Sequence, residues 1–231
     1  MTSRIKLGRL NFHLITLFPE LIRPYLAESI VARAIRRKII NVSIHDLRDY
    51  GGEHYRIDDR PYGGGPGMVI RAEPVIRAVL AIKSKKPARV VILSPAGKEF
   101  TNKLAERWAK QDRPLILIAG RYEGIDARVK KILKAEPARA TVEEISVGPY
   151  TVTGGELPAL IIIDAVTRRL PGVLGDDLSV EEKRVASHEV YTRPEVITHR
   201  RRHYRVPSVL LSGHHKKIND WNLTRSGCRG W

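Results

Sequence analysis

The sequence LILIAGRYEGID, residues 115–126, decides the fold of this chain. Its first part, 115–119, is a short unbroken apolar run, which is the pattern of a strand that is buried on both faces. The remainder begins at Gly120 and combines glycine with tyrosine and charged residues, which is the composition of a loop. A buried strand that ends in such a loop is typical of a parallel sheet, in which ligands bind beyond the carboxyl ends of the strands.

Short apolar runs earlier in the chain alternate with helical patterns. Strand-like runs occupy residues 12–18, 42–47 and 90–93. In residues 75–80 and 100–108, apolar side chains recur with the spacing of one helix face, and charged residues occupy the other face. This alternation predicts an α/β fold with a parallel sheet flanked by helices.

Three predicted strand exits have unusual compositions. They read LSPAG at 93–97, AGRYEGID at 119–126 and VGPYTVTGGE at 147–156. If the three loops converge, their backbone N–H and C=O groups would bracket an adenine and a charged tail like that of an amino acid. The alternative is that each is an ordinary turn between a strand and a helix.

A fourth glycine-rich segment, DRPYGGGPGM, occupies residues 59–68. Its glycines permit positive φ angles and a close approach of backbone N–H groups to a ligand, while Arg60 and Tyr62 offer a phosphate partner and a stacking plane. A nucleotide or an RNA would suit these groups. A tight turn without a ligand is the alternative, because the segment matches neither of the common phosphate-binding glycine motifs.

The composition of the chain points to an anionic partner. The 231 residues include 41 Lys and Arg against 25 Asp and Glu, a formal net charge of +16. Such a field favours nucleic acid or an anionic membrane surface, although charge that only maintains solubility is the alternative. The single cysteine, Cys228, excludes an internal disulfide framework, so we expect a cytoplasmic protein.

Neither a membrane segment nor a metal site is expected. The apolar run at 160–163 is far shorter than the roughly 20 residues that a bilayer requires. Residues 1–11 are basic and lack the apolar stretch of a secretory signal, so we interpret them as a basic extension. The histidines do not have the spacing of metal ligands.

Eight short motifs together carry a specific resemblance. In order they are TLFPE at 16–20, DDRPYGGGPGM at 58–68, LSPAG at 93–97, GRYEGID at 120–126, TGGELPA at 153–159, PGVLG at 171–175, YTRPEV at 191–196 and VLLSG at 209–213. Their order and approximate spacing resemble those of the bacterial tRNA (guanine-N1)-methyltransferases of the SPOUT class. The resemblance extends from about residue 12 to the last residue.

This resemblance implies an enzyme that uses S-adenosylmethionine to methylate N1 of guanosine 37 of tRNA, directly 3′ of the anticodon. It also implies an obligate homodimer and a parallel α/β sheet with a deep C-terminal trefoil knot, one of the exceptions to the rule that chains avoid threading. The domains would then be the extension at 1–11, a knotted methyltransferase domain at 12–172, a linker at 173–190 and a small helical tRNA-binding domain at 191–231.

The family motifs also carry binding residues over to this chain. The resemblance implies that the cofactor contacts lie in the three strand exits, at Leu93, Ser94, Gly120, Tyr122, Glu123, Val147, Gly148, Pro149, Tyr150, Thr151, Val152, Gly154 and Gly155. Arg60, Gly63, Gly64 and Gly65 would contact tRNA or shape the site. The basic run at 199–205 is longer than the loop of the family, and its Arg200, Arg201 and Arg202 suit phosphate contacts, with a tyrosine available for stacking; a solvated run of charges is the alternative. A role for Mg²⁺ stays open, with Glu123 as the residue that would assist it.

Two catalytic residues follow from the same resemblance. Arg168 matches the family arginine on the helix after TGGELPA, and it would hold negative charge at O6 of the guanine. The family aspartate that acts as a base aligns with Lys183, so we move this role to Glu182, with Glu181 and Asp177 as second choices. The alternative is that this acidic run is only a solvated linker.

Two other functions therefore remain open. The chain could be an RNA-binding homologue with impaired catalysis, because Lys183 replaces the aspartate. It could also be a SPOUT methyltransferase that acts on another RNA. One further departure, Pro149 in place of a family aspartate, removes a carboxylate and a backbone donor beside the cofactor.

Overall fold

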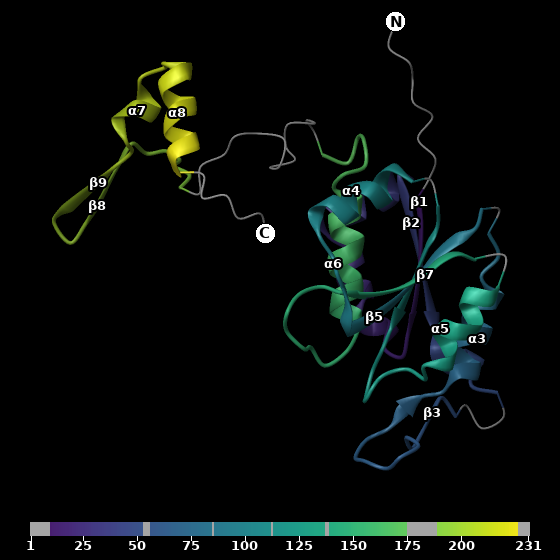
Figure 1. The fold of residues 1–231 in the computed structure, drawn as a ribbon. Helices are drawn as coiled ribbons and strands as arrows, with labels where there is room; N and C mark the ends of the chain where they lie inside the picture. The colour runs from purple at the N-terminus through teal and green to yellow at the C-terminus, as the bar shows by residue number, and fades with distance from the viewer. Residues whose placement is uncertain are drawn as a thin grey trace, which may run out of the picture. The chain divides into compact units, whose positions relative to one another are not determined.

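The fold consists of two compact units, residues 1–174 and 175–231 (Figure 1). The computed structural model describes residues 10–52, 56–84, 86–111, 113–136, 139–174 and 189–225. The predicted base Glu182 and its alternatives, Glu181 and Asp177, lie outside these residues, as does most of the predicted basic extension.

A five-stranded parallel sheet forms the centre of the first unit. Its spatial order is β2, β1, β6, β5, β7, and all neighbouring strands pair in parallel. The strands are β1 (Leu10–Thr16), β2 (Ile40–Asp46), β5 (Ala88–Glu99), β6 (Leu115–Ala119) and β7 (Arg139–Ser146). The predicted α/β class is confirmed, and the strand-like runs at 12–18, 42–47, 90–93 and 115–119 each overlap a strand.

Alternate side chains of the strands enter two separate cores. On β6, Leu115 and Leu117 face one core, while Ile116 and Ile118 face the other. The first core is covered by α2 (Ser29–Arg36), α4 (Asn102–Lys110) and α6 (Glu156–Thr167). The second is covered by α3 (Ala72–Ala81) and α5 (Arg128–Ala135), on the opposite side of the sheet (Figure 1).

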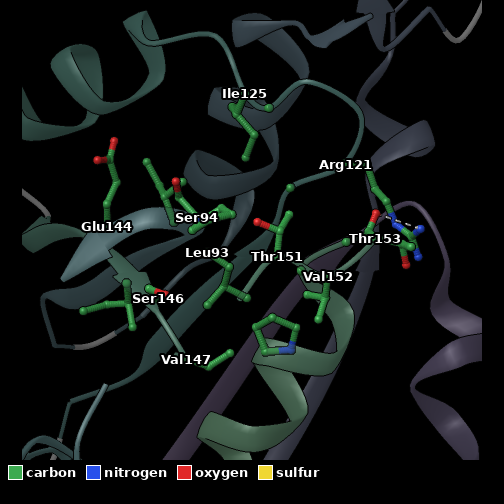
Figure 2. Close-up of a pocket in the computed structure, with 18 of the residues that line it drawn as sticks. Leu93, Ser94, Arg121, Ile125, Glu144, Ser146, Val147, Thr151, Val152 and Thr153 are labelled. Atoms are coloured by element: carbon green, nitrogen blue, oxygen red, sulfur yellow. Dashed lines mark hydrogen bonds between the residues drawn. The ribbon is translucent and has the colours of Figure 1, made fainter. Parts of the chain in front are cut away.

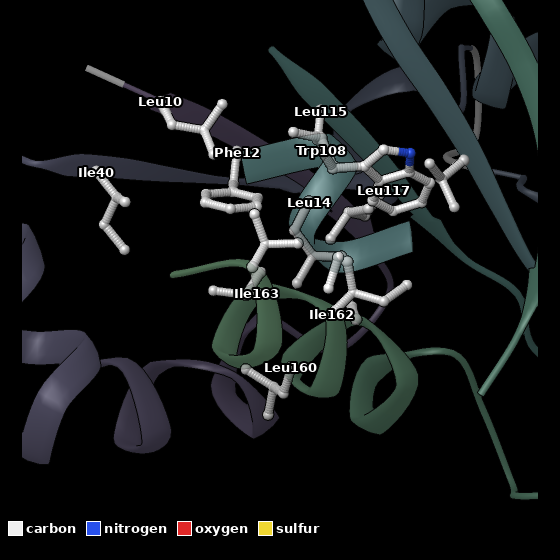
Figure 3. Close-up of a cluster of buried hydrophobic side chains, with 14 of the residues drawn as sticks. Leu10, Phe12, Leu14, Ile40, Trp108, Leu115, Leu117, Leu160, Ile162 and Ile163 are labelled. Atoms are coloured by element: carbon white, nitrogen blue, oxygen red, sulfur yellow. The ribbon is translucent and has the colours of Figure 1, made fainter. Parts of the chain in front are cut away.

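The position of α6 depends on the first of these cores. Leu160, Ile162 and Ile163 of α6 are buried beneath Phe12 and Leu14 of β1 (Figure 3). This contact holds the start of α6 beside the ends of the central strands, since a helix packed on a sheet has little freedom to slide once its side chains interdigitate.

The first of the three predicted loops is not a turn between a strand and a helix. Strand β5 continues to Glu99, and both Leu93 and Lys98 pair with Ile145 of β7. The residues between them therefore leave the ladder as a bulge, and a Cβ atom on Gly97 would overlap the backbone of Ile145. Sequence reasoning saw the Pro and Gly but could not find the strand that resumes after them.

The glycine-rich segment is the tip of a short antiparallel hairpin. Its arms are β3 (Asp58–Asp59) and β4 (Val69–Ile70). The other elements of this unit are η1 (Pro19–Leu21), α1 (Arg23–Leu26) and η2 (Leu47–Tyr50).

The second unit contains a hairpin as well as helices. Strands β8 (Val196–His199) and β9 (Arg202–Arg205) pair in antiparallel fashion, and α7 (Ser208–Leu211) and α8 (His215–Arg225) follow. The hairpin was not predicted. No helix in the described part of the chain has the length and apolar content needed to cross a membrane.

Candidate active site

A cavity of about 350 Å³ lies between the bulge of β5 and the carboxyl ends of β6 and β7 (Figure 2). This volume lies within the range of roughly 300–1,000 Å³ found for small-molecule sites. Its walls are the bulge after Leu93, the loop that starts at Gly120, and the segment from Val147 to Gly155. The three segments that the sequence singled out thus converge on one pocket, because parallel strands end at the same edge of a sheet.

Most of the predicted cofactor residues line this pocket. They are Leu93, Ser94, Gly120, Tyr122, Glu123, Val147, Tyr150, Thr151, Val152, Gly154 and Gly155. Gly148 and Pro149 do not line it. The Ser146 hydroxyl donates to the Gly148 carbonyl at 2.8 Å.

The lining combines apolar walls with polar groups from loops. Leu93, Ile125 and Val152 supply apolar surface, while Ser94 and Thr151 bring hydroxyl groups (Figure 2). The acidic lining residues are Glu123 and Glu144. A flat apolar group, a hydrogen-bonding group and a cationic group would all find complementary surface here.

Gly155 allows α6 to begin directly against the end of β6. Its N–H donates to the Gly120 carbonyl at 2.8 Å. A Cβ atom on Gly155 would lie 2.6 Å from the Ala119 Cα and 2.8 Å from the Gly120 nitrogen, and both of these neighbours are backbone atoms. The close approach therefore depends on the missing side chain.

We expect Gly155→Ala to lower the free energy of unfolding by about 1–3 kcal/mol, the usual cost of overpacking. Gly120→Ala is the matched control, because a Cβ atom there would lie 3.3 Å from its nearest neighbour, the Leu93 carbonyl oxygen. Urea unfolding of both variants measures the difference. Equal effects would mean that the contact with Ala119 is not what limits this position.

A buried ion pair holds the pocket loops together. Glu156 is only 2% exposed; it accepts hydrogen bonds from the Thr16 hydroxyl at 2.7 Å and from Arg121 Nε at 3.0 Å. The Arg121 guanidinium also lies 4.5 Å from the centre of the Phe18 ring and donates to the Thr153 carbonyl at 3.3 Å (Figure 2). Three loops from distant parts of the chain are therefore joined at one point.

Sequence reasoning assigned no role to this pair. Both residues stand in quoted motifs, GRYEGID and TGGELPA, but only the fold brings them into contact. The available signal was a glutamate in the first turn of a helix that begins after two glycines, where the helix dipole favours a negative charge.

The glycine hairpin is attached to the second pocket loop. The Glu123 N–H donates to the Met68 carbonyl at 3.0 Å, and the Ile70 N–H donates to the Gly124 carbonyl at 2.9 Å. The tip, residues 63–65, has positive φ angles and open space around each glycine. The predicted RNA contacts in this segment are thus exposed beside the pocket loops.

Tyr122 connects the same two segments through its side chain. Burial raises the pKa of its hydroxyl, and the charge of Asp58 on β3 and a hydrogen bond to it raise this pKa further. Its backbone has a φ of +58°, in the left-handed region that few residues other than glycine adopt. Backbone strain of this kind is common at functional sites.

The predicted arginine does not line the pocket of its own chain. Arg168 follows the last residue of α6, twelve residues after Glu156 at its start. At 1.5 Å per residue, about 18 Å of helix separates the two positions. Arg200, Arg201 and Arg202 lie in the second unit, on the β8–β9 hairpin and its turn. The described residues contain no group of three or more His, Cys, Asp or Glu that could hold a metal ion.

The fold and the pocket define a class: an α/β protein that binds a small ligand at the carboxyl ends of a parallel sheet. The chain matches the family model described as "tRNA (Guanine-1)-methyltransferase TrmD" over residues 10–231, and it belongs to this family. The resemblance inferred from the eight motifs is thereby confirmed.

Curated relatives agree with this assignment. A tRNA (guanine-N(1)-)-methyltransferase of Thermus thermophilus is 45% identical over 218 residues, which cover 92% of this chain and 84% of the relative. Proteins with the same name from Dehalococcoides mccartyi and Carboxydothermus hydrogenoformans are 41% and 42% identical, and the matches cover 94% of this chain in both cases and 86% and 83% of the relatives.

Proposed function

We propose that this protein transfers a methyl group from S-adenosylmethionine to N1 of guanosine 37 of tRNA, directly 3′ of the anticodon. The observation that carries the proposal is the convergence of three family motifs on one pocket in a chain that matches the family over residues 10–231. The net charge of +16 supports a tRNA substrate, and a tRNA substrate supports a location in the cytoplasm.

The pocket fits the proposed cofactor. When bound, S-adenosylmethionine supplies a methyl group on a positively charged sulfur. Glu123 brings negative charge to the lining of a cavity in a basic chain, which suits a cationic ligand, whereas Glu144 is paired with Lys130 at 3.0 Å. The apolar lining residues, such as Leu93 and Val152, would hold the flat base, and the hydroxyls of Ser94 and Thr151 would hydrogen-bond its polar groups.

We also propose that the segment before α6 forms the trefoil knot implied by the motifs. In the sheet, β5 stands between β6 and β7, so the chain that leaves β7 must cross back past β5 to reach β6. It arrives at Gly155, which hydrogen-bonds Gly120 and packs against Ala119. This return crossing through the pocket loops supports a threaded chain.

The chemical difficulty lies in the guanine, because N1 carries a proton at neutral pH. A base must remove this proton, and a cation near O6 must stabilise the negative charge that develops. We assign the second role to Arg168, whose planar guanidinium suits an oxygen acceptor. The first role falls to Glu182 in the linker, outside the residues that the structure describes.

A homodimer would bring Arg168 to a pocket. Leu157 and Ile161 of α6 are 61% and 43% exposed, and they lie on the same stripe of the helix as Asp164 and Arg168. In a dimer with two-fold symmetry, this stripe of α6 contacts the same stripe on the other chain. If two α6 helices cross antiparallel, Arg168 of one chain faces the start of α6 in the other, where that chain has its pocket.

The exposed apolar surface beside α6 supports the same arrangement. Leu21 and Tyr25 are large, exposed residues, and the Tyr25 hydroxyl donates to Asp164 of α6 at 2.8 Å, which places both elements on one surface. The hydrogen bond adds to burial in raising the pKa of Tyr25 to about 12. Contiguous apolar patches of this kind mark protein interfaces.

The second candidate function is RNA binding with impaired catalysis, and Lys183 favours it. An ammonium group has no lone pair with which to accept a proton, unless burial lowers its pKa. This candidate predicts tRNA binding without methyl transfer.

The test is transfer of labelled methyl groups from S-adenosylmethionine to unmodified tRNA, followed by nuclease digestion to locate the methylated nucleoside. We expect label in N1-methylguanosine for the wild type, and a loss of about 10²- to 10⁴-fold in rate for Glu182→Gln, as for other general bases. A tRNA without the guanosine 3′ of the anticodon should accept no label.

Glu181→Gln and Asp177→Asn are the matched controls. Normal activity in Glu182→Gln together with a loss in one control would move the base within the linker. Label in another nucleoside or another RNA would contradict the proposed substrate, and tRNA binding without transfer would favour the second candidate. Reactions with and without Mg²⁺ test whether the ion assists.

A further inference from the structure

The β8–β9 hairpin, residues 196–205, has features that its own folding does not require. Its two turn residues, Arg200 and Arg201, have φ angles of +45° and +63°. Tight two-residue turns of this conformation favour Asn and Gly, because other residues pay a steric penalty of about 1–2 kcal/mol each. Two arginines at these positions suggest that their side chains contact a ligand, because they do not favour the turn itself.

The pairing of the strands sorts the side chains onto two faces. Ile197 pairs with Tyr204, and His199 pairs with Arg202, so these four residues share one face. Ile197 and Tyr204 are 58% and 56% exposed, although both are large and largely apolar. We call this the Tyr204 face.

The opposite face is different in kind. There the Thr198 hydroxyl and His203 Nδ1 are 2.9 Å apart, within hydrogen-bonding distance. The branched apolar residue of that face, Val196, is half-buried, so the exposed large apolar side chains of the hairpin, Ile197 and Tyr204, lie on the Tyr204 face. Their exposure there points to a ligand that covers this face.

The charges around the Tyr204 ring indicate which kind of ligand it binds. Residues 199–205 contain four arginines and no acidic residue. Positive charge around an exposed aromatic ring is the pattern of proteins that bind single-stranded nucleic acid, in which bases stack on the ring and cations contact the phosphates.

We propose that the Tyr204 face binds an unpaired nucleotide of the RNA substrate. The ring of Tyr204 stacks on the base, Ile197 extends the apolar surface, and the arginines at 200–202 contact the neighbouring phosphates. This inference rests on the proposed function only in taking RNA as the substrate; it adds where the second unit contacts the RNA and which kind of nucleotide it takes.

The test measures the dissociation constant of the full-length protein for unmodified tRNA at several salt concentrations. Tyr204→Ala should raise this constant about 5- to 150-fold, which corresponds to the loss of one stacked base, with the salt dependence unchanged. Tyr204→Phe keeps the ring and should bind like the wild type. A fully paired RNA duplex should show no difference between Tyr204→Ala and the wild type.

The charge at the tip is tested separately. The double variant Arg200→Gln and Arg201→Gln should lower the slope of log affinity against log salt by about 1.4–1.8, since each phosphate contact contributes roughly 0.7–0.9. The double variant Lys103→Gln and Lys110→Gln is the matched loss of two charges, because both lysines are exposed on α4. Thr198→Val is the control on the opposite face of the hairpin.

Three results would overturn the inference. In the first, Tyr204→Ala binds both tRNA and phosphatidylserine vesicles like the wild type. In the second, Thr198→Val and Tyr204→Ala lose equal tRNA affinity. In the third, Tyr204→Ala keeps its tRNA affinity but loses binding to phosphatidylserine vesicles. The last would assign the hairpin to a membrane surface. Methyl transfer at saturating tRNA is recorded in parallel, so a protein that binds tRNA through Tyr204 but transfers no methyl group contradicts the proposed function and leaves this inference standing.

Discussion

Arg168→Ala is expected to lower the rate of methyl transfer about 10²- to 10⁴-fold, the effect of removing a group that stabilises developing charge. The reason is that guanine O6 gains negative charge as N1 loses its proton, and only a cation at O6 offsets it. The rate is measured in single turnovers at saturating tRNA and cofactor, so that the loss reports on chemistry and not on binding.

Arg168→Lys and Arg169→Ala are the controls. The lysine keeps the charge but loses the planar pair of donors, so an intermediate rate is expected. Arg169 is the adjacent residue, and its guanidinium donates to the Ala165 carbonyl of its own helix at 2.6 Å. A normal rate for Arg168→Ala, or an equal loss for Arg169→Ala, would remove Arg168 from the chemistry.

A mixing experiment tests whether Arg168 acts across the dimer. Val152 lines the pocket, so Val152→Arg should block it. Dimers that contain one Arg168→Ala chain and one Val152→Arg chain keep one open pocket, and the Val152→Arg chain supplies an intact Arg168 to it. Activity in a mixture of two inactive variants is therefore expected. No recovery in verified mixed dimers would contradict the shared site.

Glu156→Gln is expected to lower the free energy of unfolding by about 3 kcal/mol, the low end of the range for breaking a buried ion pair. The low end applies because the Arg121 side chain is 18% exposed and keeps its bond to the Thr153 carbonyl. Affinity for the cofactor should fall as well, since Arg121, the partner of Glu156, and Gly155, the residue before Glu156, both line the pocket. Urea unfolding and calorimetric titration measure the two effects.

The chain offers a matched control in a second ion pair at the same pocket. Lys130 and Glu144 lie 3.0 Å apart, and both side chains are 35% exposed. Glu144→Gln should therefore cost less than about 1 kcal/mol, as is usual for solvated pairs. If Glu144→Gln proves as costly as Glu156→Gln, burial does not explain the importance of Glu156.

Elements set by local sequence patterns could be predicted, whereas features that depend on contacts between distant parts of the chain could not. The strand at 115–119 was predictable because its apolar run is a local pattern, and the helices at 72–81 and 102–110 were predictable because their spacing is local too. The loop after Leu93 was predicted wrongly as a simple strand exit, since only pairing with β7 reveals that the strand resumes.

The sequence by itself determined the class of the fold, the family, and the three segments that line the pocket. It could do so because parallel strands must end at one edge, so residues after those strands share a location whatever the details of packing. Only the packing of the folded chain brings Arg121 to Glu156, puts Arg168 after the end of α6, about 18 Å of helix from Glu156, and places Tyr204 on the same face as Ile197. These relations depend on which strands and helices pack together and in which register, and no local spacing of residues encodes that.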